Sequence, residues 1–104
     1  MSENAVMRVV LHAPTPDALL RARNNAANLL REAPKAQIKI VVNAQAVVAA
    51  LDSPHETLDA ATWLCPNTLQ RANRQTRDPL QVLPHGAILE LAQLQQEGWL
   101  YVRA

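Results

Sequence analysis

Apolar positions in this chain follow two patterns that alternate along its length. Short runs rich in Val, Ile and Leu are typical of strands buried on both faces of a sheet. Between these runs, apolar residues recur three and four positions apart, as in helices with one buried face. The pattern predicts strands at 5–12, 37–44, 60–65, 80–83 and 99–103, and helices at 16–33, 44–51, 66–75 and 87–98. Over 44–51 a strand remains the alternative, because valine and alanine have opposite preferences.

Threonine, proline and glycine mark the ends of two predicted helices. Thr15 is a favourable N-cap, and Pro16 suits the first helical position, where its missing N–H costs nothing. Pro34 ends the first helix near Ala33, and Gly98 ends the last helix. The buried stripe predicted for the last helix consists of Ile88, Leu91 and Leu94 or Gln95.

The alternation of strands and helices predicts a single α/β domain over residues 1–104, built on a mostly parallel five-stranded sheet. Ligands of such sheets bind outside the carboxyl ends of the strands. The first four predicted strands end at His12, Asn43, Cys65 and His85. We therefore expect these four side chains at one edge of the sheet.

The overall charge argues against a nucleic-acid partner. Ten Lys and Arg against nine Asp and Glu leave a formal net charge of +1, whereas binding through bulk charge normally requires a far more basic protein. Arg71, Arg74 and Arg77 recur every third residue, and on a helix they would form a basic stripe that could receive an anion or an acidic partner. Such a stripe is more often a solvated face. We predict that nucleic acid is not a partner.

The sequence predicts neither a membrane-spanning segment nor a targeting signal. No apolar stretch approaches the ~20 residues that cross a bilayer. Residues 1–14 lack the basic start and the small-residue cleavage pattern of a signal peptide. We expect a cytoplasmic protein with no membrane partner, in a compartment where a free thiol stays reduced.

Cys65 is the only cysteine, so the chain can form no internal disulfide and no dithiol couple. The sequence has no Cys/His spacing of the zinc type, and we predict neither a metal nor another cofactor. If Cys65 is the N-cap of the helix that begins at Pro66, the N–H groups of Asn67 and Thr68 and the helix dipole would lower its pKa and make it a nucleophile. The alternative is a buried cysteine that only packs.

Two histidines are candidate partners of this thiol. His12 and His85 follow the first and fourth predicted strands, and either could orient or deprotonate Cys65, as in Cys–His nucleophilic catalysis. Alternatively, each is a loop histidine that is hydrogen-bonded to nearby backbone. For either histidine taken alone, the loop role is favoured.

Three segments resemble one protein family. The stretch "CPNTLQ" is similar to the C-x-N-T-L segment of the small DsrE/DsrF-like proteins, which include YchN-type proteins and subunits of sulfur-relay complexes. The stretch "NNAANLL" at 24–30 resembles the N-N-x-x-N-L-L stretch of their first helix. Residues 82–103 resemble their closing V-x-P-x-G…E-L…L-Q-x-x-G-x-x-Y-[IV]-[KR] pattern.

The resemblance implies a three-layer α/β/α sandwich that assembles into homodimers, trimers or hexamers. In the sulfur-relay members the matching cysteine carries sulfur as a persulfide, a role that would fall to Cys65. One hypothesis is therefore a sulfur carrier or sulfurtransferase, whose partners are its own copies and proteins that donate or accept sulfur. The other is a non-catalytic oligomeric protein that binds a small ligand beside Cys65. The candidate ligand-binding residues are His12, Asn43, Asn67, Thr68 and His85.

Overall fold

The computed structural model describes residues 6–104 of the chain. Within this range, strands and helices alternate as the sequence predicts. The elements are β1 (Arg8–Ala13), α1 (Pro16–Glu32), β2 (Gln37–Val42), α2 (Ala46–Asp52), the 3₁₀-helix η1 (Asp59–Ala61), β3 (Thr62–Leu64), α3 (Pro66–Arg71), β4 (Gln81–Val82), α4 (Ala87–Gln96) and β5 (Leu100–Arg103). Residues 44–51, where a strand was the alternative, contribute helix α2.

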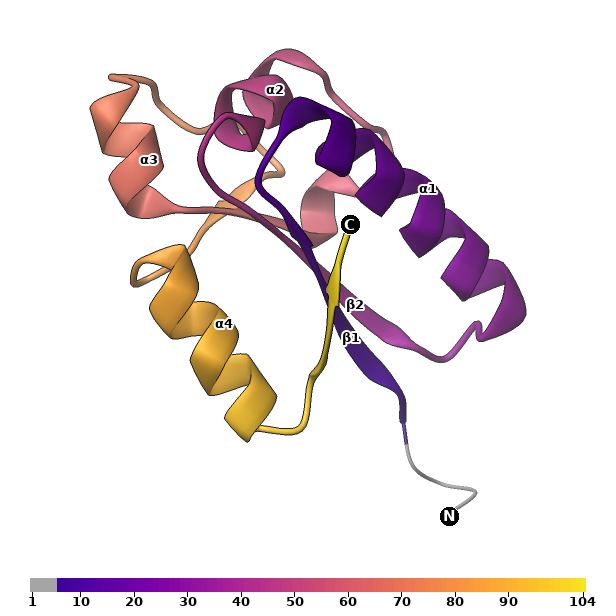
Figure 1. The fold of residues 1–104 in the computed structure, drawn as a ribbon. Helices are drawn as coiled ribbons and strands as arrows, with labels where there is room; N and C mark the ends of the chain where they lie inside the picture. The colour runs from indigo at the N-terminus through magenta and orange to yellow at the C-terminus, as the bar shows by residue number, and fades with distance from the viewer. Residues whose placement is uncertain (1–5) are drawn as a thin grey trace.

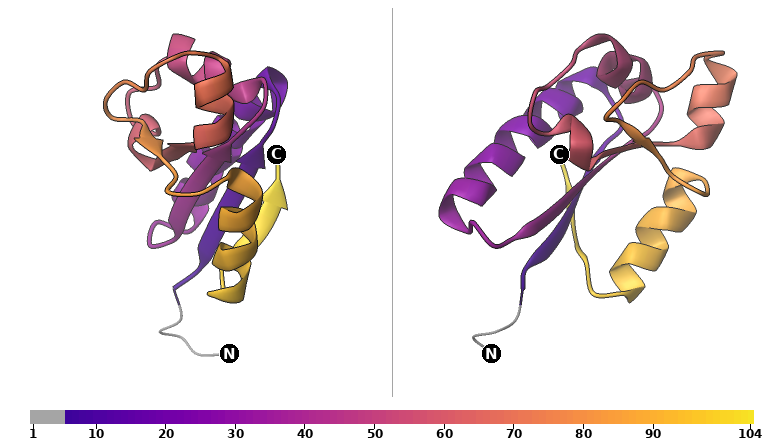
Figure 2. Two further views of the ribbon diagram at one scale, coloured as in Figure 1. Left: turned by 90° about the vertical axis from the view of Figure 1, so that its left-hand side faces the viewer. Right: turned by 180° about the vertical axis from the view of Figure 1, so that it is seen from behind.

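The five strands form one sheet in the order β4-β3-β2-β1-β5. Every neighbouring pair is parallel, which confirms the predicted α/β class. Figure 1 shows β1 and β2 running diagonally between α1 on one side and α4 on the other, with α2 next to α1. The two further views in Figure 2 agree with this arrangement. The sheet therefore lies between two helical layers.

Successive side chains of a strand point to opposite faces of its sheet, and β1 accordingly contributes to two cores. Val9, Leu11 and Ala13 belong to a large apolar cluster with α1 and α2. Val10 belongs to a smaller cluster with Cys65 and the buried side chains of α4. Cys65 thus lies on the face of the sheet that α4 covers.

The predicted helix boundaries at Thr15 and Gly98 are confirmed. The Thr15 hydroxyl accepts a hydrogen bond from the N–H of Ala18 at 3.1 Å, and Pro16 occupies the first helical position. Gly98 has a φ of +96°, a conformation that is easy for glycine and strained for other residues. The N–H of the next residue, Trp99, then bonds to the carbonyl of Leu94 at 2.9 Å.

Several elements are shorter than the sequence predicts, and the largest differences are in the third helix and the third strand. The helix predicted over 66–75 ends at Arg71, because Asn73 lies in the left-handed region with a φ of 53°. The third strand contains only Thr62–Leu64, since η1 takes up the residues before it. The first residue of the predicted strand 5–12 lies outside the described residues.

The buried stripe predicted for α4 is wrong at one position. Ala87, Leu91 and Leu94 are buried, whereas Ile88 is 70% exposed. The buried residues are spaced four and three apart and share one face. Because each helical residue is rotated by about 100° from the one before it, Ile88 points away from that face. Leu94, and not Gln95, completes the stripe.

A buried ion-pair cluster connects the loops on the α1 and α2 side. Asp59 is 1% exposed, and its carboxylate lies 3.4 Å from the guanidinium of Arg23 and 2.8 Å from that of Arg77. Arg77 also donates to the carbonyls of Ala50 and Leu51 near the end of α2. We call Arg23, Asp59 and Arg77 the Asp59 cluster. It joins α1, α2, η1 and the loop that precedes β4.

No helix in residues 6–104 combines the length and the apolar character needed to cross a bilayer.

Candidate functional site

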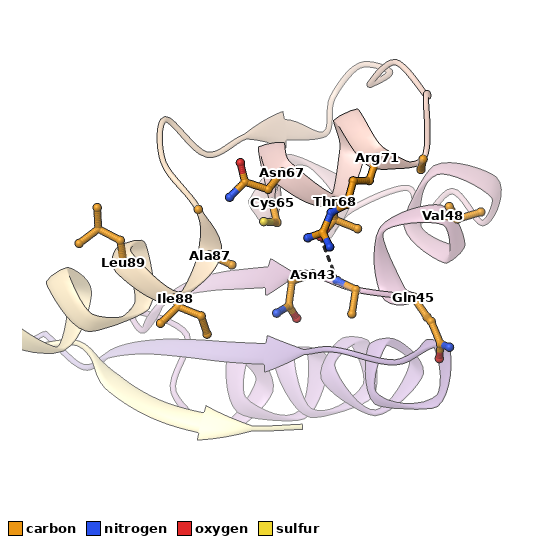
Figure 3. Close-up of a pocket in the computed structure, with 13 residues that line it drawn as sticks. Asn43, Gln45, Val48, Cys65, Asn67, Thr68, Arg71, Ala87, Ile88 and Leu89 are labelled. Atoms are coloured by element: carbon orange, nitrogen blue, oxygen red, sulfur yellow. Dashed lines mark hydrogen bonds between the residues drawn. The ribbon is translucent and has the colours of Figure 1, made fainter.

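A cavity of about 580 Å³ opens at the carboxyl ends of β2 and β3. Its walls come from the turn after β2, from α2 and α3, and from the start of α4 (Figure 3). This is the edge of the sheet at which the sequence places the site. The residues that line it are Asn43, Ala44, Gln45, Val48, Cys65, Asn67, Thr68, Arg71, Ala72, Gly86, Ala87, Ile88 and Leu89. We call it the Cys65 cavity.

Cys65 lies at the boundary between this cavity and the core. It is the N-cap of α3, with Pro66 at the first helical position, as the sequence predicts. Its N–H bonds to the carbonyl of Val42 at 2.9 Å, which anchors it to the end of β2. The residue is only 5% exposed and packs against Val10 and Val41. The thiol is therefore packed on one side and lines the cavity on the other.

The surroundings of the thiol stabilise its anion. Burial raises the pKa of Cys65, but the nearby N–H groups of Thr68, Ala87 and Asn67 and the Thr68 hydroxyl lower it by more. The net effect is a thiol pKa below its ordinary value. Asn67 and Thr68 were predicted from the sequence, whereas Ala87 was not. The thiol thus lies between the first turns of two helices, α3 and α4.

His12 does not line the cavity itself, but its ring contacts the side chain of Asn43, which does. One ring nitrogen, Nε2, lies 2.9 Å from Oδ1 of Asn43, and the other, Nδ1, lies 2.6 Å from the hydroxyl of Tyr101. Because Oδ1 can only accept, Nε2–H is the donor to Asn43, and in the neutral ring Nδ1 accepts from Tyr101. The sequence indicated His12 and Asn43 but missed Tyr101, whose strand lies beside β1 only because of the strand order.

His85 takes a different position from the one we expected beside Cys65. Its side chain is 59% exposed, and Nδ1 lies 3.1 Å from a carboxylate oxygen of Glu90 on the first turn of α4. It does not line the Cys65 cavity. The structure thus brings together Cys65, Asn43, Asn67 and Thr68, places His12 behind Asn43, and leaves His85 outside.

The predicted basic stripe does not form. Because α3 ends at Arg71, the three arginines do not share a helix face. Arg71 lines the Cys65 cavity, Arg74 pairs with Asp52 at 2.7 Å, and Arg77 belongs to the Asp59 cluster. Figure 3 shows the Arg71 side chain extending from α3 towards the middle of the cavity. Sequence spacing alone could not separate these three roles.

Thr68 also fixes the floor of the cavity. Its hydroxyl accepts the N–H of Ala44 at 3.3 Å (dashed in Figure 3), and Ala44 has a φ of 49° in the turn after β2. One side chain therefore touches both the thiol and the turn that carries Asn43. In residues 6–104 no group of three or more His, Cys, Asp and Glu side chains is placed to hold a metal ion.

Comparison with protein-family models finds no match, and the chain has no match among curated proteins. The chemistry of the site therefore rests on its geometry.

Proposed function

We propose that the protein carries sulfur as a persulfide on Cys65. One observation carries this proposal: a lone cysteine with a lowered pKa lines a cavity at the sheet edge, between the first turns of two helices. A thiolate is the form of cysteine that attacks sulfur. The lining residues give it hydrogen-bond donors and space for a second molecule.

The reaction needs no oxidant and no second cysteine in this chain. The Cys65 thiolate attacks the outer sulfur of a donor persulfide, R–S–SH. A new S–S bond forms at Cys65 as the donor's S–S bond breaks, and its electron pair leaves with R–S⁻. The products are Cys65–S–SH and the donor thiolate. Transfer to an acceptor thiolate is the same reaction in reverse. The N–H groups around Cys65 would also stabilise the terminal persulfide anion.

Kinship with the DsrE/DsrF-like proteins is part of this proposal. The parallel sheet between two helical layers agrees with the fold that the sequence resemblance implies. Sulfur donor and acceptor proteins would be the partners, and the cytoplasm would keep the free thiol reduced.

Assembly into a homo-oligomer completes the proposal. The edge strand β5 exposes Leu100, Tyr101 and Val102, and α4 exposes Ile88 and Leu89 beside the cavity. Contiguous exposed apolar residues are typical of interaction surfaces. A second copy that covered them would also shield the Cys65 cavity from water. Light scattering at micromolar concentration should give at least the mass of a dimer, and a strictly monomeric mass would remove this part.

A second candidate is a small-ligand-binding protein without sulfur chemistry. Cys65 is only 5% exposed, and Val48, Ile88 and Leu89 give the cavity an apolar wall. In this case the thiol would contact the ligand without reacting. The reactivity of Cys65 distinguishes the two candidates.

The deciding experiment is persulfide loading measured by intact mass spectrometry. After incubation with glutathione persulfide, the protein should gain the mass of one sulfur atom, and dithiothreitol should remove it. Cys65→Ser, which removes the thiol and retains a similar size, should gain nothing. A wild-type protein that stays unmodified while its Cys65 reacts with iodoacetamide would exclude the sulfur carrier and leave the ligand-binding protein.

A further inference from the structure

The Cys65 cavity has a marked charge asymmetry. Arg71 is the one charged side chain among its lining residues, and none of them is acidic. Among residues 6–104 the Arg71 guanidinium has no hydrogen-bond or ion-pair partner within the usual distances. Arg74 and Arg77, which follow it in the sequence, both have carboxylate partners. Arg71 is therefore the arginine of this segment that is free to bind an anion.

A fixed amide donor on the opposite wall adds to this asymmetry. Oδ1 of Asn43 is occupied by His12 at 2.9 Å, and His12 is in turn held by Tyr101 at 2.6 Å. With Oδ1 occupied, the NH₂ group of Asn43 is the part of the amide that is left for a ligand. The Tyr101–His12 pair thereby leaves Asn43 with a donor, not an acceptor, for any ligand that contacts it. Figure 3 shows both residues beside Cys65, with Arg71 extending from α3 and Asn43 lying just after β2.

We propose that the Cys65 cavity binds an anionic group, a carboxylate, of the small molecule that reacts with Cys65, between the Arg71 guanidinium and the Asn43 amide. Guanidinium and amide N–H donors match carboxylate oxygens in charge and direction. This inference rests on the proposed function and narrows its sulfur donor to a low-molecular-weight persulfide that bears a carboxylate. The anion site itself rests on Arg71, Asn43, His12 and Tyr101.

Two alkylating probes of similar size test the anion site without any sulfur chemistry. Iodoacetate is an anion and iodoacetamide is neutral, and both form the same C–S bond with the Cys65 thiolate as iodide leaves. The ratio of their second-order rate constants cancels the thiolate fraction, so it reports how the cavity treats a carboxylate. We expect this ratio to be higher in the folded protein than in the urea-unfolded chain, and to fall with added salt.

Arg71→Gln should lower the ratio about fivefold, the upper range for a charge pair that is open to solvent. Arg71→Lys should restore part of it, since it keeps the charge and loses the planar fork. Asn43→Asp replaces the NH₂ donor with a charged oxygen of the same size and should also lower the ratio. The matched control is Arg74→Gln, the same substitution at an arginine outside the cavity, which should leave the ratio unchanged.

A ratio that Arg71→Gln and Arg74→Gln change equally would overturn the anion site, because only bulk charge would then be acting. If persulfide loading succeeds but the ratio does not depend on Arg71, the anion site is wrong and sulfur transfer stands. If the ratio depends on Arg71 but no persulfide forms, the anion site stands and sulfur transfer is wrong. Circular dichroism of each variant checks that the fold is retained.

Discussion

The Asp59 cluster and the Cys65 cavity both contain arginine side chains, but these are paired with a carboxylate in the cluster and not in the cavity. In the Asp59 cluster the charges are paired, with the buried Asp59 between the buried guanidinium of Arg23 and the partly buried guanidinium of Arg77. The Nε of Arg23 is the one buried side-chain polar atom without a hydrogen-bond partner in residues 6–104. In the Cys65 cavity, Arg71 and the Asn43 amide face open space. The two regions draw on overlapping parts of the chain, 23–77 for the cluster and 43–89 for the cavity, yet the charges of the first are paired and Arg71 in the second is not.

The difference shows which polar groups hold the fold together and which are available for a ligand. Removing one partner of a buried pair leaves the other charge without compensation, so the cost appears in stability. Removing an exposed charge that has no partner costs little stability. We therefore expect substitutions in the Asp59 cluster to change the free energy of unfolding, and substitutions in the Cys65 cavity to change the reactivity of the thiol.

The largest expected effect is on stability. Asp59→Ala leaves the buried Arg23 and the partly buried Arg77 without their carboxylate, and should lower the free energy of unfolding by about 3 kcal/mol. Urea denaturation followed by circular dichroism measures it. Arg71→Gln is the comparison from the cavity, and should change the free energy of unfolding by less than about 0.5 kcal/mol. Equal losses from the two substitutions would contradict the distinction between the regions.

The next effect is on reactivity. Thr68→Val keeps the shape of the side chain but removes the hydroxyl that helps to lower the pKa of Cys65, so the pKa of the thiol should rise. At pH 7 a smaller fraction would then be thiolate, and alkylation should slow by about two- to tenfold, the value of one hydrogen bond. At a pH above both pKa values the two proteins should react at similar rates.

The full pH profile of iodoacetamide alkylation is the measurement. Thr57→Val is the matched control, because Thr57 lies outside the cavity and contacts His55 instead. A Thr68→Val profile with an unchanged midpoint would show that the hydroxyl does not stabilise the thiolate. A reactivity that appears only on unfolding would make Cys65 a core residue.

The sequence predicted the features of the molecule that depend on local chemistry. Thr15 and Gly98 set helix ends through bonds to residues a few positions away, and Cys65-Pro66 placed the thiol at the start of a helix. The features it missed depend on long-range placement. Tyr101 and His12 are 89 residues apart in sequence. Their contact requires β5 to pair with β1, and no local pattern specifies that order.

The arginines illustrate the same limit. A spacing of three suggested one helix face for Arg71, Arg74 and Arg77, and the prediction was wrong because the left-handed Asn73 ends the helix before the second of them. Asparagine is one of the residues that adopt this conformation most readily. The signal was therefore present in the sequence, but its effect depended on where the chain had to turn. The carboxylates that Arg74 and Arg77 meet were not predictable from spacing.

The smallest expected effect concerns the pair of Arg74 and Asp52. It tests whether an ion pair that is exposed contributes less to stability than the buried Asp59 cluster does. The pair is charged and bonded at 2.7 Å like the Asp59 cluster, but both side chains are open to solvent. The hydrogen bond from Arg74 holds the pKa of Asp52 below its ordinary value. Because the pKa is lower in the folded state, the stabilisation is present above the ordinary pKa of aspartate and is lost as the pH falls through the folded value.

Arg74→Gln should therefore raise the pKa of Asp52 towards its ordinary value in an NMR titration of the side-chain carboxyl, and added salt should reduce the difference between the two proteins. At neutral pH the unfolding midpoint in urea should not change measurably, because solvent screens an exposed pair and ordering two flexible side chains offsets the attraction. Asp59→Ala, measured beside it, supplies the buried counterpart. If Arg74→Gln destabilised the protein as much as Asp59→Ala does, burial would not be what distinguishes the charges that stabilise the fold from the exposed charges. The exposure of Arg71 would then no longer support its assignment to ligand binding.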